Sequence, residues 1–265
     1  TPLYSSAASD VYKRQNLYAT WSQGFRNGGV NALPTVGFID ETLGGTFPNI
    51  NQFSADKVDN YEIGVKGFLA DRTLRYSAAL YFIDWQDPQA RITGYNSGVD
   101  GVSNATADAE SQGLELELDG VIGEHWTYSL GYAYTDAQFA EAGALYFVDV
   151  ADGLRLPGHS EHMTAGALAY NTSFQGNDLK FSVDATYRSD YENGLPGRGD
   201  YNLDGFTIWN AYVSYELPHW TFRIFGKNLA DEDTAVSASL VSQQTNRLVL
   251  NRPRTLGLSV TYRLE

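Results

Sequence analysis

The sequence predicts an all-β fold: an antiparallel, up-and-down sheet of about ten strands that forms a segment of a transmembrane β-barrel. Three observations lead to this prediction. Strand-length segments alternate between apolar and small or polar residues, the connections between them alternate between long and short, and the charged residues keep to one face. All three are expected of a barrel that has lipid outside and water inside.

The alternation is clearest in the last hairpin, residues 220–264. Its closing segment, 253–264, has apolar residues at every second position from Leu256 to Leu264, with small or polar residues between them. Side chains of a strand point alternately to opposite faces, so this strand has one oily side and one polar side. In a water-soluble sheet the oily side would pack on a core, whereas in an outer-membrane barrel it would face lipid.

Ten such segments follow one another from residue 16 onward, each about 10 residues long, the length that a tilted strand needs to cross a bilayer. They are 16–24, 57–67, 73–84, 109–118, 125–136, 161–170, 178–189, 205–216, 220–228 and 253–264. Segment 125–136 is the most regular and segment 161–170 the faintest. The apolar faces of the clearest segments comprise Tyr61, Ile63 and Val65; Leu74, Tyr76, Ala78, Leu80 and Phe82; Leu114, Leu116 and Leu118; Trp126, Tyr128, Leu130, Tyr132 and Tyr134; Leu179, Phe181, Val183, Ala185 and Tyr187.

The connections between these segments alternate in length without exception. The long ones are 25–56, 85–108, 137–160, 190–204 and 229–252, and the short ones are 68–72, 119–124, 171–177 and 217–219. Membrane barrels have short periplasmic turns and long extracellular loops, whereas a soluble sandwich has no reason to separate them. We therefore expect the long connections outside the cell and the C-terminal end on the periplasmic side.

Charged residues within the segments fall opposite the apolar faces. They are Glu62, Lys66, Arg75, Glu115, Glu117, Lys180, Asp184, Arg188, Arg223, Lys227 and Arg263. A charge that faces lipid at the bilayer midplane costs about 2–4 kcal/mol, so a water-filled lumen is the expected place for these side chains. Aromatic residues near segment ends, such as Trp126 and Trp220, suit the level of the lipid headgroups.

The composition narrows the functional class. No run of about 18 uncharged apolar residues is present, which excludes a membrane-spanning helix but not a barrel. The net charge of −14 among 265 residues argues against nucleic acid as a partner. The absence of cysteine fits an exported protein. Residues 1–15 have neither a strand nor a helix period and resemble translated sequencing-adapter read-through, so we interpret them as a non-native or disordered leader.

Several short motifs resemble those of the TonB-dependent outer-membrane receptors. The run Gly226–Asp233 resembles the N-L-x-D turn that precedes the family's last long loop, and Arg252–Tyr262 resembles its closing strand. The other similar motifs are Val58–Lys66, which matches a Y-E-x-G-x-K strand, together with Leu80–Asp87, Ser111–Glu117 and Tyr18–Phe25. The motifs follow one another in order over residues 16–264.

This resemblance implies a 22-stranded barrel plugged by an N-terminal domain. Residues 16–265 would be the C-terminal barrel portion, with the plug and the TonB-contacting segment missing. The resemblance also implies a bacterial outer-membrane location and lipid as a partner. It implies import of a scarce nutrient, most often a ferric siderophore, driven through TonB, with no catalytic residue and no cofactor. The chain departs from the family at its end, where Leu264 and Glu265 stand instead of a terminal aromatic residue.

Ligand contacts are expected in the long connections, because loops on a rigid scaffold carry most binding residues. The candidates are Arg26, Arg91, Tyr95, Tyr191 and Arg198. Glu115 and Glu117 lie two positions apart on one strand, so they share a face that lines the lumen and are not expected to act as catalytic carboxylates.

Two other kinds of chemistry are weaker interpretations. Asp200–Gly205 matches the first half of a calcium-binding loop, but the twelfth position is Ala211, so a polar turn is favoured and no metal site is expected. A ten-stranded outer-membrane protease would need a histidine at the extracellular rim, for which His159 and His162 are candidates without an evident orienting carboxylate. A soluble β-sheet binding protein is the remaining alternative.

Overall fold

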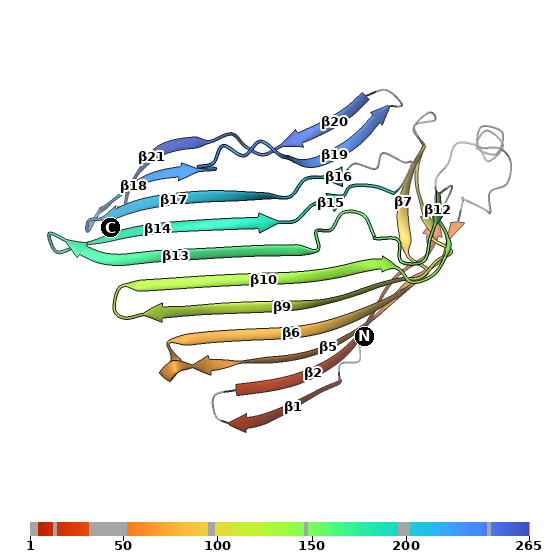
Figure 1. Cartoon of the computed structure of the whole chain (residues 1–265), viewed down its shortest axis with the longest axis horizontal. Helices are drawn as coiled ribbons and strands as arrows, with labels where there is room; N and C mark the ends of the chain where they lie inside the picture. Colours follow the sequence, from red (N-terminus) through yellow and green to blue (C-terminus); the bar gives the residue numbers. More distant parts are fainter. Residues whose placement is uncertain are drawn as a thin grey trace.

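A single antiparallel sheet forms the body of the molecule in the computed structural model, which describes residues 5–12, 15–31, 52–94, 99–145, 148–195, 202–242 and 245–264. Its strands lie side by side in chain order, as an up-and-down sheet requires (Figure 1). They are β1 (Ser5–Tyr12), β2 (Gln15–Arg26), β5 (Asp56–Leu69), β6 (Leu74–Gln86), β9 (Ala109–Ile122), β10 (Trp126–Phe139), β13 (His162–Phe174), β14 (Asn177–Arg188), β17 (Phe206–Glu216), β18 (Trp220–Lys227) and β21 (Thr255–Tyr262). The described sheet is open, with β1 and β21 at its two edges.

All ten predicted strands are confirmed, including the faint segment 161–170, which is β13. Residues 1–15, in which the sequence shows no strand or helix period, contain β1, which pairs with β2 from Ser5↔Trp21 to Tyr12↔Gln15. The ladder bonds of a sheet join main-chain groups, so a strand can form there without a regular side-chain period. That residues 1–15 are a non-native leader stays a prediction.

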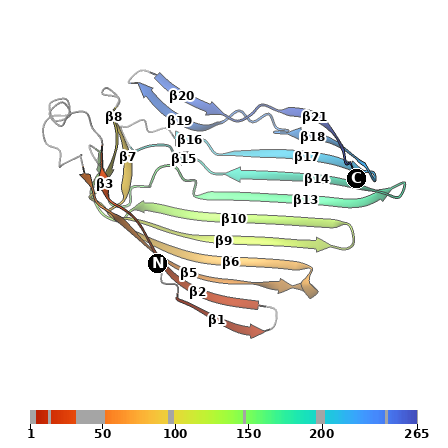
Figure 2. The same ribbon diagram turned by 180° about the vertical axis from the view of Figure 1, so that it is seen from behind.

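The long connections contain small hairpins that the sequence did not reveal. They are β3 (Gly29–Val30) with β4 (Gln52–Phe53), β7 (Gln89–Gly94) with β8 (Val99–Asn104), β11 (Gly143–Leu145) with β12 (Val148–Val150), β15 (Tyr191–Glu192) with β16 (Asn202–Leu203), and β19 (Ala235–Ser242) with β20 (Thr245–Leu250). They gather at one end of the sheet, as the views from both sides show (Figures 1 and 2). The short turns, one of which is the 3-10 helix Ala70–Arg72, lie at the opposite end.

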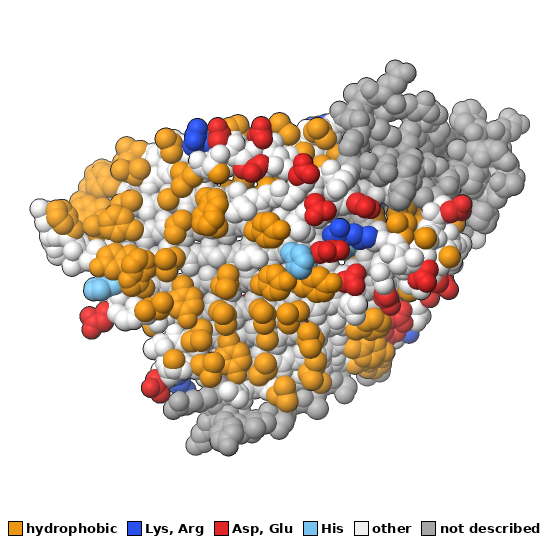
Figure 3. All heavy atoms as spheres, in the orientation of Figure 1, with side chains coloured by type: hydrophobic (Ala, Val, Ile, Leu, Met, Phe, Trp, Pro, Cys, Tyr) orange, Lys and Arg blue, Asp and Glu red, His pale blue; other side chains and the backbone are white. Residues whose placement is uncertain are grey.

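The apolar side of the sheet has no core to cover it. Its side chains stay exposed, for example Leu258 at 68% and Ile224 at 63%, and no large side chain in the described ranges is fully buried. Hydrophobic side chains spread over this face, while acidic ones gather toward the end with the long connections (Figure 3). No helix among the described residues is long and apolar enough to cross a membrane. The exposed apolar face agrees with a sheet that meets hydrocarbon rather than protein.

Aromatic side chains on the polar face lie over glycines of the neighbouring strand. Phe225 of β18 covers Gly257 of β21, its register partner, and Tyr18 of β2 covers Gly64 of β5 in the same way. A Cβ atom at either glycine would collide with the ring. The glycines therefore leave room for large rings close to the backbone on the polar face, which is a known use of glycine in strands.

An arginine placed on the apolar face should destabilise the sheet in a bilayer. Leu130 lies on that face in the middle of β10 and is 43% exposed. In the complete barrel that contains this sheet, we expect Leu130→Arg to lower the free energy of unfolding in lipid vesicles by about 2–4 kcal/mol, the cost of a charge that faces lipid. The measurement is urea unfolding in vesicles, followed by tryptophan fluorescence.

The matched control is Ser129→Arg, one residue away at almost the same depth. Ser129 points to the other face and pairs with Asp119 of β9, so a new guanidinium there meets water and an opposite charge. We expect a change below about 1 kcal/mol for this variant. Equal losses for the two variants would show that the two faces do not have different solvents.

Candidate functional site

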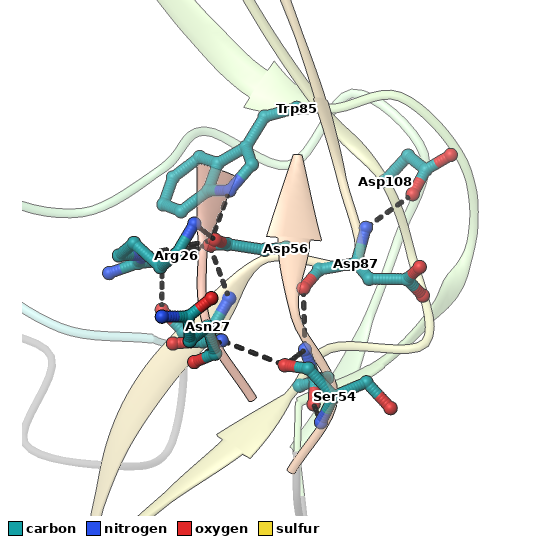
Figure 4. Close-up of polar contacts among 9 residues, drawn as sticks. Arg26, Asn27, Ser54, Asp56, Trp85, Asp87 and Asp108 are labelled. Carbon is teal, nitrogen blue, oxygen red and sulfur yellow. Dashed lines mark hydrogen bonds and ion pairs between the residues drawn. The ribbon is translucent and has the colours of Figure 1, made fainter. Parts of the chain in front are cut away.

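The strand ends on the side of the long connections are held by a polar network centred on Asp56. This carboxylate is 2% exposed and accepts hydrogen bonds from Arg26 Nε at 2.8 Å, Trp85 Nε1 at 2.9 Å and the Gln89 amide at 3.3 Å (Figure 4). The amide of Arg26 donates to it as well, at 3.0 Å, and the guanidinium completes an ion pair. Charge-assisted bonds of this kind are stronger than neutral ones and fix a defined geometry.

The same network joins two long connections to each other. Gln89 Nε2 donates to the carbonyl oxygen of Ser54 at 2.7 Å, and Asn104 Nδ2 donates to that of Asp87 at 2.7 Å. The amide of Asp87 in turn donates to Asp108 Oδ1 at 2.9 Å (Figure 4). Connections 25–56 and 85–108 are therefore bonded into one unit above β2, β5 and β6.

Further contacts extend this unit across all the long connections. A bridge between Ala105 and Leu145 joins the second to the third, and the amide of Gly158 donates to Glu192 O at 2.7 Å to join the third to the fourth. Asn193 Nδ2 donates to Ala238 O at 2.6 Å and joins the fourth to the fifth. Small apolar clusters lie inside this layer; they comprise Ala105, Ala107, Phe139, Val150 and Leu195, and, separately, Tyr191, Leu203 and Ala238. We call these five bonded connections the rim layer.

The base of the last long connection is built by Asn228, which is 4% exposed. Its Nδ2 donates to the carbonyl oxygens of Glu232 and Arg252, both at 2.8 Å, and its Oδ1 accepts from the Glu232 amide at 2.8 Å. Asp231 accepts from the Arg254 amide at 2.8 Å. Both Asn228 (φ 49°) and Asp231 (φ 58°) adopt the left-handed backbone region, which asparagine and aspartate tolerate best among non-glycine residues. The N-L-x-D motif is thus a clamp that closes the connection at its base.

Sequence comparison agrees with this architecture. The family model "TonB dependent receptor-like, beta-barrel" matches residues 4–229. The chain belongs to the TonB-dependent receptor β-barrel family.

Two curated relatives show how much of such a receptor the chain represents. The ferric-pyoverdine 358 receptor of Pseudomonas putida is 26% identical over 208 residues, which cover 74% of this chain and 23% of that receptor. The pesticin receptor of Yersinia enterocolitica is 28% identical over 130 residues, which cover 49% of this chain and 17% of that receptor. The chain thus spans about a quarter or less of the length of these relatives.

Solved TonB-dependent receptors share the fold. The ferric yersiniabactin uptake receptor of Yersinia pestis superposes with a TM-score of 0.78 at 17% identity, covering 97% of this chain and 36% of that receptor. The ferric-catecholate import receptor Fiu of Escherichia coli K12 gives a TM-score of 0.71 at 21% identity, covering 97% of this chain and 34% of that receptor. At these identities the likeness establishes the fold and nothing more specific.

The ligand candidates take different positions in the rim layer. Arg26 is bound to Asp56, and its guanidinium also lies 5.3 Å from the Trp85 ring. Tyr191 is 7% exposed and its hydroxyl donates to Val236 O at 2.8 Å, so it packs between connections. Arg91 is exposed on β7, whereas Tyr95 and Arg198 lie outside the described residues. A ligand contact by any of the five stays a prediction.

Some rim residues were missed by the sequence interpretation. Asp56 and Trp85 carry the network, yet only the position of Asp56, directly before a predicted strand, could have pointed to it. Arg188 was noted only as a lumenal charge. It lies with its guanidinium 3.9 Å above the ring of Tyr191 and 5.1 Å from that of Phe206. Pairings between separate connections depend on the register of the sheet below them, which no local motif encodes.

The geometry gives little support to the two weaker interpretations, a protease with a rim histidine and a calcium-binding loop. His162 Nδ1 lies 2.9 Å from the Tyr132 hydroxyl, and the Nε2 atom of His159 is buried without a hydrogen-bond partner in the described part of the chain. No group of three or more potential metal ligands occurs among the described residues, although Asp200 and Tyr201 lie outside them. Ala211, at the twelfth position of the calcium motif, pairs with Gly226 inside the sheet.

Removing the charge of Asp56 should loosen the first two long connections. Asn at this position keeps the size of the side chain, but its amide group would face the donors of Arg26 and Trp85. Because Arg26 is half exposed and partly screened, we expect a loss of about 1.5 kcal/mol, near the low end for a bond to a charged group. This corresponds to a roughly tenfold faster amide exchange at Arg26 and Gln89 in Asp56→Asn. Unchanged exchange would contradict the network, and Asp178→Asn, at the opposite end of the sheet, is the control.

Acid should loosen the third long connection through His159. Burial lowers the pKa of His159, and the Arg155 guanidinium lowers it further, against the opposite influence of Glu161 and Asp136. The unfolded imidazole has a pKa of about 6.5, so the folded form loses stability as the pH falls below that value toward the lower folded pKa. We expect amide exchange across 151–161, corrected for its intrinsic pH dependence, to accelerate between pH 7.5 and 5.5.

The substitution His159→Gln should abolish this pH dependence, because glutamine does not titrate in that range. His219→Gln, at the short-turn end of the sheet, should leave it unchanged. A pH effect of equal size in the His159→Gln chain would assign the titration to another group.

Proposed function

We propose that this chain is the C-terminal barrel portion of an outer-membrane receptor that imports a scarce nutrient, a ferric siderophore in the first instance, with energy delivered through TonB. The match of the family model over residues 4–229 is the observation that supports this most directly. TonB would act on an N-terminal segment, and the 22-strand count of the complete barrel stays a prediction.

The two faces and the rim layer suit this role. The exposed apolar face would be solvated by outer-membrane lipid, and the polar face would line the transport lumen. The rim layer would meet the cargo first, since it lies where the long connections gather (Figure 1). Its bonded structure would hold loop side chains in defined places, which lowers the entropy that ligand binding must overcome.

The names of similar proteins favour a ferric siderophore over other nutrients. The relatives include receptors named for ferric pyoverdine, and the solved structures include uptake receptors for ferric yersiniabactin and ferric catecholates. A copper transporter is also among the structural neighbours, so metal cargo outside this class is a second candidate. Vitamin B12, haem and glycans are the further possibilities within the family.

A non-enzymatic role fits the geometry better than proteolysis. The rim histidines contact Tyr132 and Arg155, with no carboxylate hydrogen-bonded to either ring in the described ranges. The soluble binding protein is also disfavoured, because a soluble sheet would bury the side chains that are exposed on the apolar face.

An uptake assay tests the proposal. The complete receptor that contains this chain is expressed in a bacterium without its own siderophore receptors, with and without TonB. The cells are offered radioactive iron as ferric pyoverdine, ferric yersiniabactin or a ferric catecholate. We expect at least one chelate to be accumulated, and accumulation to disappear without TonB. Receptor in the outer membrane that accumulates none of the three chelates would reject the siderophore assignment, and recovery in the soluble fraction would reject the receptor itself.

A further inference from the structure

Two pairs of aromatic side chains lie at the short-turn end of the apolar face, and they have the same composition. In the first pair, Trp126 begins β10, and its ring centroid lies 4.9 Å from that of Tyr170, its register partner on β13. In the second pair, Trp220 begins β18 and lies 4.7 Å from Tyr262, its register partner on β21. The same arrangement of two rings is therefore built twice, on separate strand pairs of one sheet.

A histidine directly precedes the tryptophan of each pair. The ring of His125 lies 5.4 Å from that of Tyr170, and the ring of His219 lies 6.3 Å from that of Tyr262. Nδ1 of His125 lies 2.9 Å from the carbonyl oxygen of Asn171, which can only accept a hydrogen bond. The hydrogen of the neutral imidazole is thus on Nδ1, and Nε2 is left as an acceptor. We call the two groups of histidine, tryptophan and tyrosine the ring clusters.

The register of the sheet places both ring clusters at one depth in a bilayer. The row of paired residues that leads from Trp126 to β18 comprises Tyr170, Phe181, Val213 and Ile224. Trp220 lies four residues before Ile224, and β18 lies four strands from β10. Four residues span about 13 Å and four strand spacings about 19 Å, so the line between the two tryptophans is inclined to this row by about 35°. The turn between β13 and β14 is offset from that between β9 and β10 in the same sense (Figure 1). Strands of membrane barrels are tilted by about 35–45°, so this line runs along the bilayer surface.

The ring clusters continue the exposed apolar face to its edge at the short turns. Trp126, Trp220 and Tyr262 are exposed, and so are His125 and His219. The edge of a lipid-facing surface is the level of the headgroups, where the amphipathic rings of tryptophan and tyrosine are favoured. An aromatic ring face attracts a cation, and an imidazole nitrogen without hydrogen accepts a hydrogen bond from one. Each cluster thus combines the groups that recognise a small ammonium group.

We propose that each ring cluster binds the headgroup of a phospholipid that carries a primary amine, as phosphatidylethanolamine does. The ammonium group lies against the exposed ring faces and donates a hydrogen bond to the histidine Nε2 atom. A choline headgroup can use the rings but has no N–H to donate, and a glycerol headgroup has no cation. This binding rests on the proposed function in one respect, since it needs the apolar face to meet the lipid of a membrane.

Native mass spectrometry of the complete receptor that contains this chain tests the preference. The purified receptor in detergent is mixed separately with phosphatidylethanolamine, phosphatidylcholine or phosphatidylglycerol of identical acyl chains, and the lipid adducts are measured at equal lipid concentrations. We expect phosphatidylethanolamine to be bound at least fivefold more tightly than phosphatidylcholine, which corresponds to about 1 kcal/mol. Phosphatidylglycerol should be bound no more tightly than phosphatidylcholine. This comparison uses the unsubstituted receptor, so it does not depend on how any variant folds.

Substitutions assign the bound lipid to the ring clusters. Trp126→Leu and Trp220→Leu should each remove one phosphatidylethanolamine adduct, and the two together should remove the preference. Trp209→Leu is the matched control and should keep it, because Trp209 is exposed on the same face of β17 but lies toward the long connections. The pair His125→Phe and His219→Phe keeps an aromatic ring and removes the acceptor. This pair should lose the preference for phosphatidylethanolamine and retain the binding of phosphatidylcholine.

Three results would overturn the proposal. The first is equal binding of phosphatidylethanolamine and phosphatidylcholine by the unsubstituted receptor. The second is tighter binding of phosphatidylglycerol, which would show that negative charge and not the amine is recognised. The third is a preference for phosphatidylethanolamine that survives the loss of both Trp126 and Trp220, which would place the lipid elsewhere on the receptor. A receptor that keeps the predicted preference but imports none of the three ferric chelates would support the lipid sites and reject only the cargo.

Discussion

One face of the sheet is apolar and exposed and the other is polar, and the rest of the structure depends on this constraint. A bilayer offers no hydrogen bonds to the main chain, so each strand must satisfy its amides and carbonyls through its neighbours. This fixes a continuous register from β2 to β21, and a slip by one residue would turn every apolar side chain toward water. The exposed Leu258 and Ile224 and the polar row of Lys180 and Arg223 are two results of the same register.

The sheet could be predicted from the sequence because its pattern is local. Trp126 to Tyr134 alternate with small residues, and that period alone specifies both the strand and its faces. The rim layer could not be predicted in this way. Asn193 and Ala238 are 45 positions apart, and they meet only because β14, β17 and β18 place their connections side by side. Strand β1 escaped notice for another reason, since main-chain pairing with β2 does not need a side-chain pattern.

The candidate site, too, could be predicted from the sequence only in part. Arg26 and Tyr191 were selected because they are suitable residue types in long connections, and both do lie in the rim layer. Their surroundings were not foreseeable: Arg26 is bound to a buried carboxylate, and Tyr191 is covered by Arg188. Asn228 shows the opposite case, because its motif was visible in the sequence and the structure supplies its physical meaning as a clamp on carbonyl and amide groups of the last connection.

The basic side chain of Arg26 at the rim and those on the polar face of β18 have different neighbours. At the rim, Asp56 neutralises Arg26 within a network that joins connections, so the ion pair serves structure. Along the wall of β17 and β18, Tyr212 and Phe225 support cations without removing their charge. A carboxylate in place of either ring would form an ion pair and cancel the positive charge, whereas an aromatic ring orients the cation and leaves its charge in place. Among the described residues, a basic side chain is thus stabilised either by a carboxylate, as Arg26 is, or by an aromatic ring, as Arg223 and Arg188 are.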